Sequence, residues 1–114
     1  MNIAELSKFG IEGPNEGNLI IDIYADWCGP CQFVSPLLEK LRDEGLINLI
    51  KVDIDQNRPL GQLFGITAIP TLLFFKDGQL LEKTIQINGQ RLVQNGMMIG
   101  ATGEETFRKI LEQM

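Results

Sequence analysis

The sequence predicts one α/β domain built on a mixed β-sheet with helices on both faces. The chain has 114 residues, 44% of them hydrophobic, which suits a single globular domain with a substantial core. In the first two thirds of the chain, apolar strand-like runs alternate with helix-like periods, and in the last third strand-like runs follow one another through tight turns. Residues 1–114 are therefore expected to form one domain.

The first half of the chain contains a short helix, two strands and a long helix. A short helix is expected at residues 3–9, followed by a connector. The run Leu19–Ala25 is almost entirely apolar, which predicts a central strand buried on both faces. The next helix is predicted by an i, i+3, i+4, i+7 spacing of Val34, Leu37, Leu38 and Leu41. Pro36 falls inside this helix and is expected to kink it, and Ile47–Ile54 reads as a second strand.

The second half is predicted to be mainly strands. Asn57 should cap a short helix that Gly65 ends. Thr71–Phe75 and Leu80–Ile87 read as strands on either side of a turn at residues 77–78. The final helix is expected to open with a capping box at Thr102–Glu105, because its apolar face follows at Phe107, Ile110, Leu111 and Met114.

Residues 84–99 predict an extra β-hairpin or meander inserted before the last helix. Asn-Gly occurs at 88–89 and 95–96, and it is the strongest short hairpin signal because both central residues of a type I′ turn need positive φ. Two-residue turns would give strand passes at Gln90–Gln94 and Met97–Ile99, with Leu92 opposite both Ile85 and Ile99. A disordered loop fits this alternating segment poorly, and a partner-selective surface is the functional alternative to mere decoration.

Charge and hydropathy exclude several classes of function. The net charge is −5 and the basic residues are scattered, which argues against a nucleic-acid partner. No apolar run approaches the roughly 18 residues that span a bilayer, so no membrane association is expected. The first ten residues lack a basic segment followed by an apolar one, so we expect no signal peptide and a reducing cytoplasm as the compartment.

The only two cysteines, Cys28 and Cys31, form one C-x-x-C between the central strand and the long helix. A closed zinc site needs four Cys or His ligands, and a chain with no His would need carboxylates or a second chain to complete one. A structural disulfide closing so short a loop would remove little unfolded-chain entropy. The cysteine pair therefore favours a redox function.

The position of the pair assigns a role to each sulfur. Cys28 stands at the helix N-terminus, where free N–H groups and the helix dipole stabilise a thiolate, so it is the expected nucleophile. Cys31 lies one turn deeper and is the expected resolving thiol. Gly29 lets a substrate backbone approach. Pro30 stiffens the turn and removes one N–H donor, which favours a reductant over an oxidant.

These residues resemble the thioredoxin family. "WCGPC" at Trp27–Cys31 is identical to the family's active-site motif, and similar surroundings are found in "KVDIDQN" at 51–57, "IPT" at 69–71 and "IGA" at 99–101. The resemblance covers about residues 18–80 and 98–114. It implies a thioredoxin fold and a protein-disulfide reductase that has no bound cofactor and is recharged by a thioredoxin reductase.

The resemblance also implies roles for residues around the cysteines. Asp22, on the central strand, is then the proton acceptor for Cys31. The alternative is that Asp22 simply lies on a solvent-exposed face of the strand. Lys51 is expected to approach this aspartate, or else to extend along the surface. Pro70 is expected to be cis and to pack against the cysteines, leaving the Ile69 backbone free for a substrate, although most X-Pro bonds are trans.

Two further residues complete the expected substrate-binding set. Trp27 is either a core aromatic or a flat lid beside the thiols, and the family favours the lid. Gly100 is expected to allow a close backbone approach near the Pro70 loop. Five other aromatic residues are expected in the core rather than the site: Tyr24, Phe33, Phe64, Phe74 and Phe75.

The sequence therefore predicts a monomer that reduces disulfide-containing proteins. Two alternatives remain open: a non-catalytic thioredoxin-like interaction subunit, and an exported disulfide oxidase or isomerase. The Gly-Pro pair and the absence of a signal peptide disfavour the exported enzyme. A mere scaffold would not require the combination of Asp22, Cys28, Cys31 and Pro70.

Overall fold

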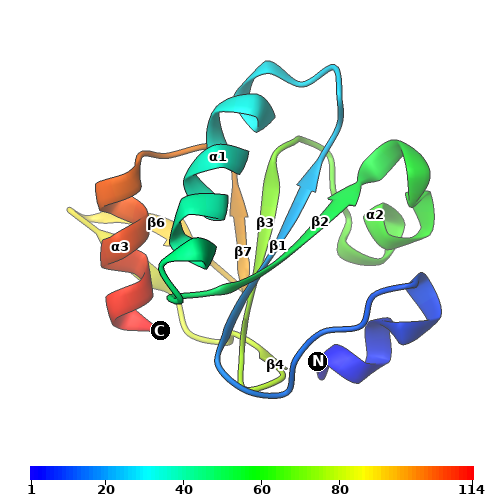
Figure 1. The fold of residues 1–114 in the computed structure, drawn as a ribbon, viewed down its shortest axis with the longest axis horizontal. Helices are drawn as coiled ribbons and strands as arrows, with labels where there is room; N and C mark the ends of the chain where they lie inside the picture. Colours follow the sequence, from blue (N-terminus) through cyan, green and yellow to red (C-terminus); the bar gives the residue numbers. More distant parts are fainter.

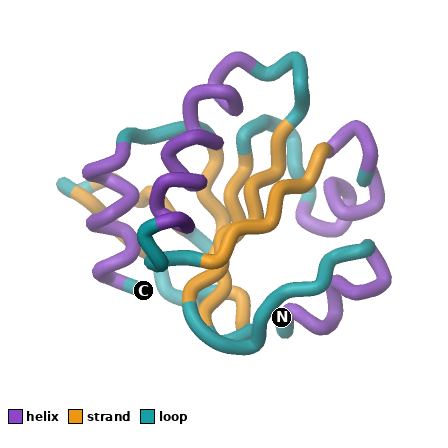
Figure 2. Tube along the Cα trace, viewed as in Figure 1, coloured by secondary structure: helices purple, strands orange, loops and turns teal.

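A computed structural model describes all of residues 1–114 and shows a mixed β-sheet between two layers of helices (Figures 1 and 2). In chain order the elements are η1 (Ile3–Phe9), β1 (Asn18–Tyr24), α1 (Gly29–Asp43), β2 (Asn48–Asp53), η2 (Ile54–Gln56), α2 (Arg58–Phe64), β3 (Thr71–Lys76), β4 (Gln79–Leu80), β5 (Ile85–Ile87), β6 (Gln90–Val93), β7 (Met97–Ile99) and α3 (Glu104–Gln113), where η marks a 3-10 helix. The main sheet has the order β2-β1-β3-β4, and β7 also pairs with β3. No helix is long and apolar enough to cross a membrane.

Alternation along the two central strands separates two hydrophobic cores. On β1, Ile20 faces the layer of α1 and α3, whereas Ile21 faces the layer of η1 and α2. On β3, Phe74 and Phe75 divide in the same way, and both are fully buried. Strand β1 pairs parallel with β2 and antiparallel with β3. It is therefore buried on both faces and both edges, as the apolar run predicts.

Helix α1, which begins between the two cysteines, forms where the sequence predicts a helix. Cys28 is its N-cap, proline stands in its first turn, and Pro36 lies within it. Its buried face carries Val34, Leu38 and Leu41. Phe33, expected in the core, is instead 59% exposed, because it lies off this buried face.

The predicted strand Leu80–Ile87 is wrong: it divides into β4 and β5, with no strand at residues 81–84. Only β4 stays on the main sheet, beside the end of β3. The edge position is then completed by β7, which pairs Met97 with Leu73 and Ile99 with Thr71. The two pieces meet at Phe74, whose carbonyl accepts from the Leu81 N–H (2.9 Å) and whose N–H donates to the Gly96 carbonyl (2.8 Å). Residues 82–95 are therefore an excursion from one interrupted edge strand.

The excursion contains the predicted β5–β6 hairpin, which packs beside α3 (Figure 1). Asn88 and Gly89 both have positive φ, as a type I′ turn requires. The expected register is wrong, because an irregularity between Ile85 and Gln86 places Ile85 opposite Val93 instead of Leu92. This shift puts the fully buried Ile85 and Val93 into the core beneath α3, while Leu92 is only partly buried.

The second Asn-Gly turn joins β6 to β7 and has a different outcome. Asn95 and Gly96 also have positive φ, and Gln94 and Met97 exchange two backbone hydrogen bonds across the turn (2.9 and 3.0 Å). Beyond this bridge the strands diverge, since β6 pairs only with β5 and β7 only with β3. The expected pairing of Leu92 with Ile99 is therefore absent.

Gly96 is enclosed where the excursion rejoins the sheet. A Cβ added there would lie 2.5 Å from Leu80 Cδ1 and 3.0 Å from the Leu81 carbonyl oxygen. By contrast, a Cβ on Gly89 would meet nothing within 4 Å.

The last helix, α3, begins differently from the prediction. Its N-cap is Gly103 and no side chain caps it, so the predicted Thr102 capping box is wrong.

Candidate functional site

The two cysteines are joined in a disulfide where β1 gives way to α1. Cys28 has extended backbone angles as the N-cap, and Cys31 lies in the first turn, with 5.3 Å between their Cα atoms. Cys28 is 5% exposed and Cys31 is 1% exposed. Gly29 and Pro30 are exposed beside them, and a Cβ on Gly29 would meet nothing within 4 Å. An incoming chain therefore reaches Cys28 more readily than Cys31.

The start of α1 provides a donor for the outer sulfur. The Cys31 backbone N–H donates to Cys28 Sγ at 3.2 Å. Pro30, between them, has no N–H to contribute. When the disulfide is reduced, the remaining N–H and the helix dipole favour the thiolate form of Cys28.

Asp22 lies on β1 beneath the first turns of α1 and is completely buried. Its Oδ2 accepts from the Ser35 hydroxyl at 2.7 Å, and its Oδ1 has no hydrogen-bond partner. Burial raises the pKa of the Asp22 carboxyl above its ordinary value of 3.8, while the Ser35 bond and the Lys51 charge oppose the shift and Glu39 adds to it. Ser35 is four residues after Cys31, so both project from the same side of α1.

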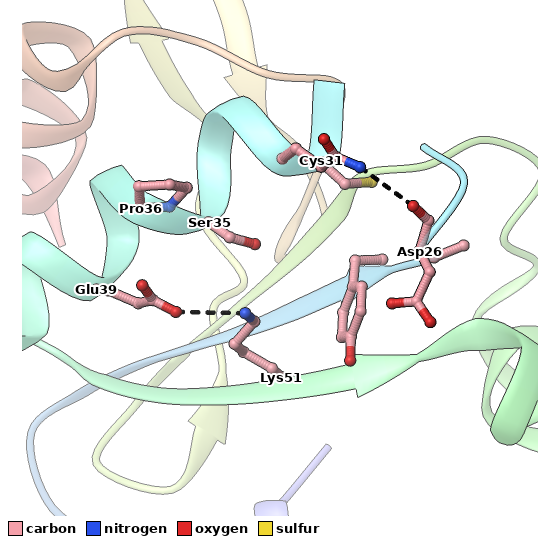
Figure 3. Close-up of a pocket in the computed structure, with 9 residues that line it drawn as sticks. Asp26, Cys31, Ser35, Pro36, Glu39 and Lys51 are labelled. Carbon is pink, nitrogen blue, oxygen red and sulfur yellow. Dashed lines mark hydrogen bonds and ion pairs between the residues drawn. The ribbon is translucent and has the colours of Figure 1, made fainter. Parts of the chain in front are cut away.

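A cavity of about 290 Å³ opens beside Ser35, the hydrogen-bond partner of this carboxyl (Figure 3). Cys31, Ser35 and Glu39 line it from α1, and Lys51 lines it from β2. Ser35 is therefore the residue that both lines this cavity and binds the buried Asp22.

Lys51 lies beside Asp22 in the strand register but does not bind it. The pairing of β1 with β2 places the two residues opposite each other. The Lys51 ammonium lies 3.3 Å from Glu39 Oε1, an ion pair drawn in Figure 3, and 5.3 Å from the centroid of the Tyr24 ring. The structure thus brings Lys51 to the cavity and directs its charge toward Glu39.

The remaining predicted residues are Trp27, Ile69, Pro70 and Gly100. Trp27 is 71% exposed, so its core reading is wrong, and its Nε1–H donates to Asp55 Oδ2 at 2.8 Å. The Ile69–Pro70 bond is cis, as expected, and Ile69 packs against the buried cluster of Ala25, Cys28 and Cys31. Gly100 has φ +96° and its N–H donates to the Pro70 carbonyl at 2.8 Å.

Sequence reasoning missed four residues that the structure places at or near the site. Ser35 and Glu39 lie on α1 and were hidden within an ordinary helical pattern, although both lie on the cavity side of that helix. Asp55 belongs to the "KVDIDQN" motif and could have been found as a polar residue following β2. Ile99 is 63% exposed immediately before Gly100, a position that periodicity alone does not reveal.

No group of three or more His, Cys, Asp or Glu side chains is placed to hold a metal ion. The arrangement consists instead of a reversible disulfide at a helix N-terminus, a buried carboxyl with a hydroxyl partner, and an exposed apolar rim. Such an arrangement is suited to thiol–disulfide exchange.

Comparison with known proteins agrees with this chemistry. Residues 7–97 match the family model described as Thioredoxin. The chain is 35% identical to the thioredoxin of Bacillus subtilis over 82 residues, covering 70% of this chain and 79% of that protein. It is 41% identical to the thioredoxin of Listeria monocytogenes over 73 residues, covering 62% of this chain and 71% of that protein.

Solved structures show the same fold. A mutant thioredoxin from Halobacterium salinarum superposes with a TM-score of 0.70 at 28% identity, covering 96% of this chain and 82% of that one. The thioredoxin of Fasciola hepatica superposes with a TM-score of 0.66 at 28% identity, covering 96% and 88%.

Proposed function

The chain belongs to the thioredoxin family, and on that premise we propose which of its residues carry the exchange. As a thioredoxin it is an oxidoreductase that acts on disulfides through a redox-active cysteine pair. The observation that carries the assignment of roles is the hydrogen bond from the Cys31 N–H to Cys28 Sγ at the start of α1.

Cys28 is the nucleophile. In the reduced protein its thiolate attacks one sulfur of a substrate disulfide, the substrate S–S bond breaks, and a mixed disulfide forms. The departing substrate thiolate takes up a proton. The exposed Gly29 and Pro30 leave room for the incoming chain, and the Ile69 backbone, Pro70 and Gly100 form the other side of the groove, with Trp27 beside it.

Cys31 resolves the mixed disulfide. It gives its proton to Asp22, whose raised pKa suits it to accept from a thiol. The Cys31 thiolate attacks Cys28 Sγ, the mixed disulfide breaks, and the second substrate sulfur leaves as a thiolate and is protonated. Two electrons and two protons have then passed to the substrate, and the Cys28–Cys31 disulfide is restored. Ser35 and the cavity return the Asp22 proton to solvent.

The rest of the cycle is also part of this proposal. A thioredoxin reductase supplies two electrons to the Cys28–Cys31 disulfide. We place the chain in the reducing cytoplasm as a monomer, where transient catalytic disulfides are the rule. Lys51 has an indirect role at most, because its ammonium is paired with Glu39.

A non-catalytic interaction subunit is the second candidate, and the disulfide's accessible surroundings are compatible with partner binding alone. Turnover of insulin disulfides with dithiothreitol separates the two. Acceleration over dithiothreitol alone supports the reductase, and no acceleration would assign the chain to the interaction class.

Three variants test the division of roles. Cys31→Ser should accumulate a stable mixed disulfide at Cys28, whereas Cys28→Ser should accumulate none; the reverse pattern would exchange their roles. Asp22→Asn should slow resolution more than the first attack, with the largest difference below about pH 8, where Cys31 depends on a proton acceptor. Equal slowing of both steps would make Asp22 purely structural.

A further inference from the structure

The diverging strands β6 and β7 border a cavity of about 470 Å³. We call it the β6–β7 wedge; residues 90–92 and 94–95 line one side and residues 97–99 and 101–102 the other. The Gln94–Met97 bridge closes its narrow end. Each strand has a pairing partner on one side only, so two strand edges face the wedge.

The β7 side of the wedge includes the neighbours of Gly100, a residue of the proposed substrate groove. Ile99 and Ala101, on either side of Gly100, line it together with Thr102. The Gly100 N–H is bonded to the Pro70 carbonyl. Arg91 lines the β6 side of the wedge, three residues before the Gln94–Met97 bridge that closes it. A chain leaving the groove past Pro70 would enter the wedge directly.

The charge in the wedge is distinctive. Arg91 is the only charged residue that lines it. Arg91 is exposed and takes part in none of the ion pairs of this acidic chain, whose net charge is −5. The other lining residues are amides, a threonine and apolar side chains, with Ile99 63% exposed. The wedge thus presents one free cation beside an apolar surface and free strand edges.

We propose that the β6–β7 wedge binds an extended segment of the substrate protein that carries an acidic residue near the reducible disulfide. The segment lies against the free edge of β7, which supplies backbone hydrogen bonds. Its apolar side chains contact Ile99, and its carboxylate pairs with Arg91. This inference rests on the proposed function, since it concerns the substrate of the same site.

Two peptides of equal length test this inference. Each contains one disulfide, with a glutamate near it in one peptide and glutamine at the same position in the other; a panel moves this position along either side of the cysteine. The pre-reduced full chain is mixed with each peptide, and single-turnover rate constants are measured by acid quench and chromatography. The neutral bis(2-hydroxyethyl) disulfide is too short to extend from Cys28 to the wedge. Its reduction therefore reports the chemistry at Cys28 alone.

The parent protein should reduce the best glutamate peptide about threefold faster than its glutamine partner, the size expected for one exposed ion pair. Arg91→Ala should remove this preference and Arg91→Glu should reverse it. Lys83→Ala is the matched control, because Lys83 is exposed in the same excursion but does not line the wedge. All variants should reduce the small disulfide at the parent rate.

Equal rates for both peptides across the panel, with normal reduction of the small disulfide, would overturn the inference and leave the proposed function intact. An equal loss of preference in Lys83→Ala would also overturn it, because net charge would then be the cause. Concentration-dependent dimerisation that Arg91→Ala abolishes, without a peptide preference, would assign the wedge to a second copy of the chain. Failure to reduce any disulfide would end both proposals.

Discussion

The buried Asp22 carboxyl is expected to make the stability of the oxidised protein fall as the pH rises. Asp22→Asn tests this with little change in shape, because the asparagine oxygen can still accept from the Ser35 hydroxyl. The unpaired Oδ1 becomes an amide nitrogen, so the variant has an unpaired group at the same place but no charge. Any difference in pH dependence between the two proteins then belongs to ionisation of this carboxyl.

The sign follows from the raised pKa of Asp22 in the folded state. Between the ordinary value of 3.8 and the folded-state pKa, the folded protein holds a proton that the unfolded chain has released. The stabilising effect of protonated Asp22 is therefore fully present below pH 3.8 and is lost as the pH rises through the folded-state pKa. Within that window, each pH unit lowers the free energy of unfolding by about 1.4 kcal/mol relative to Asp22→Asn.

Urea denaturation followed by far-ultraviolet circular dichroism measures this difference. Both proteins are kept oxidised, so that the cysteine thiols do not titrate. The free energy of unfolding of the parent minus that of Asp22→Asn should fall from acidic pH and then become constant. Parallel curves for the two proteins over the whole range would refute the reasoning, since Asp22 would then titrate alike in the folded and unfolded states.

Three other perturbations have defined outcomes. Ser35→Ala removes a hydrogen bond that lowers the pKa of Asp22, so the decline in stability should extend to higher pH; an unchanged pH profile would contradict this role. Gly96→Ala should cost about 2–5 kcal/mol of stability by denaturant titration, from positive φ plus overlap, whereas Gly89→Ala should cost about 1–2 kcal/mol, from positive φ alone; equal losses would contradict the overlap. The hydrogen bond from Arg108 lowers the pKa of Glu44, so Arg108→Gln should return that pKa toward 4.5 in a carbon-13 NMR titration, and no change would show that the bond is not formed in solution.

Local patterns were sufficient to predict most of the elements. The apolar run of β1, the helical period of α1 and the two Asn-Gly turns each depend on residues close together in the chain, and each forms where predicted. The "WCGPC" motif predicted the disulfide position for the same reason. Strand boundaries and register depend on distant neighbours instead. The Phe74 N–H takes Gly96 as its partner, and this bond completes the edge strand with β7 rather than with residues 81–84.

The site was predictable in its sulfur chemistry and less so in its polar surroundings. Asp22 stood out because a carboxylate interrupts an apolar strand. Its partner Ser35 did not, since the two residues are 13 positions apart and meet only when α1 packs on β1. The role of Lys51 was also beyond local reasoning, because whether it turns toward Asp22 or Glu39 depends on how β2 and α1 pack together.

Both ends of the 82–95 excursion are attached to one residue, since Phe74 bonds to Leu81 on entry and to Gly96 on return. The two ends of the excursion are therefore held together, as in a closed loop. The free-energy cost of closing a loop grows only slowly with its length. Changes in the turn and in exposed positions of β6 can then accumulate without disturbing the cysteines, provided that Ile85, Ile87 and Val93 keep their buried side chains. Substitutions in such a segment can change substrate specificity on one side of the molecule without changing the redox chemistry of the cysteines.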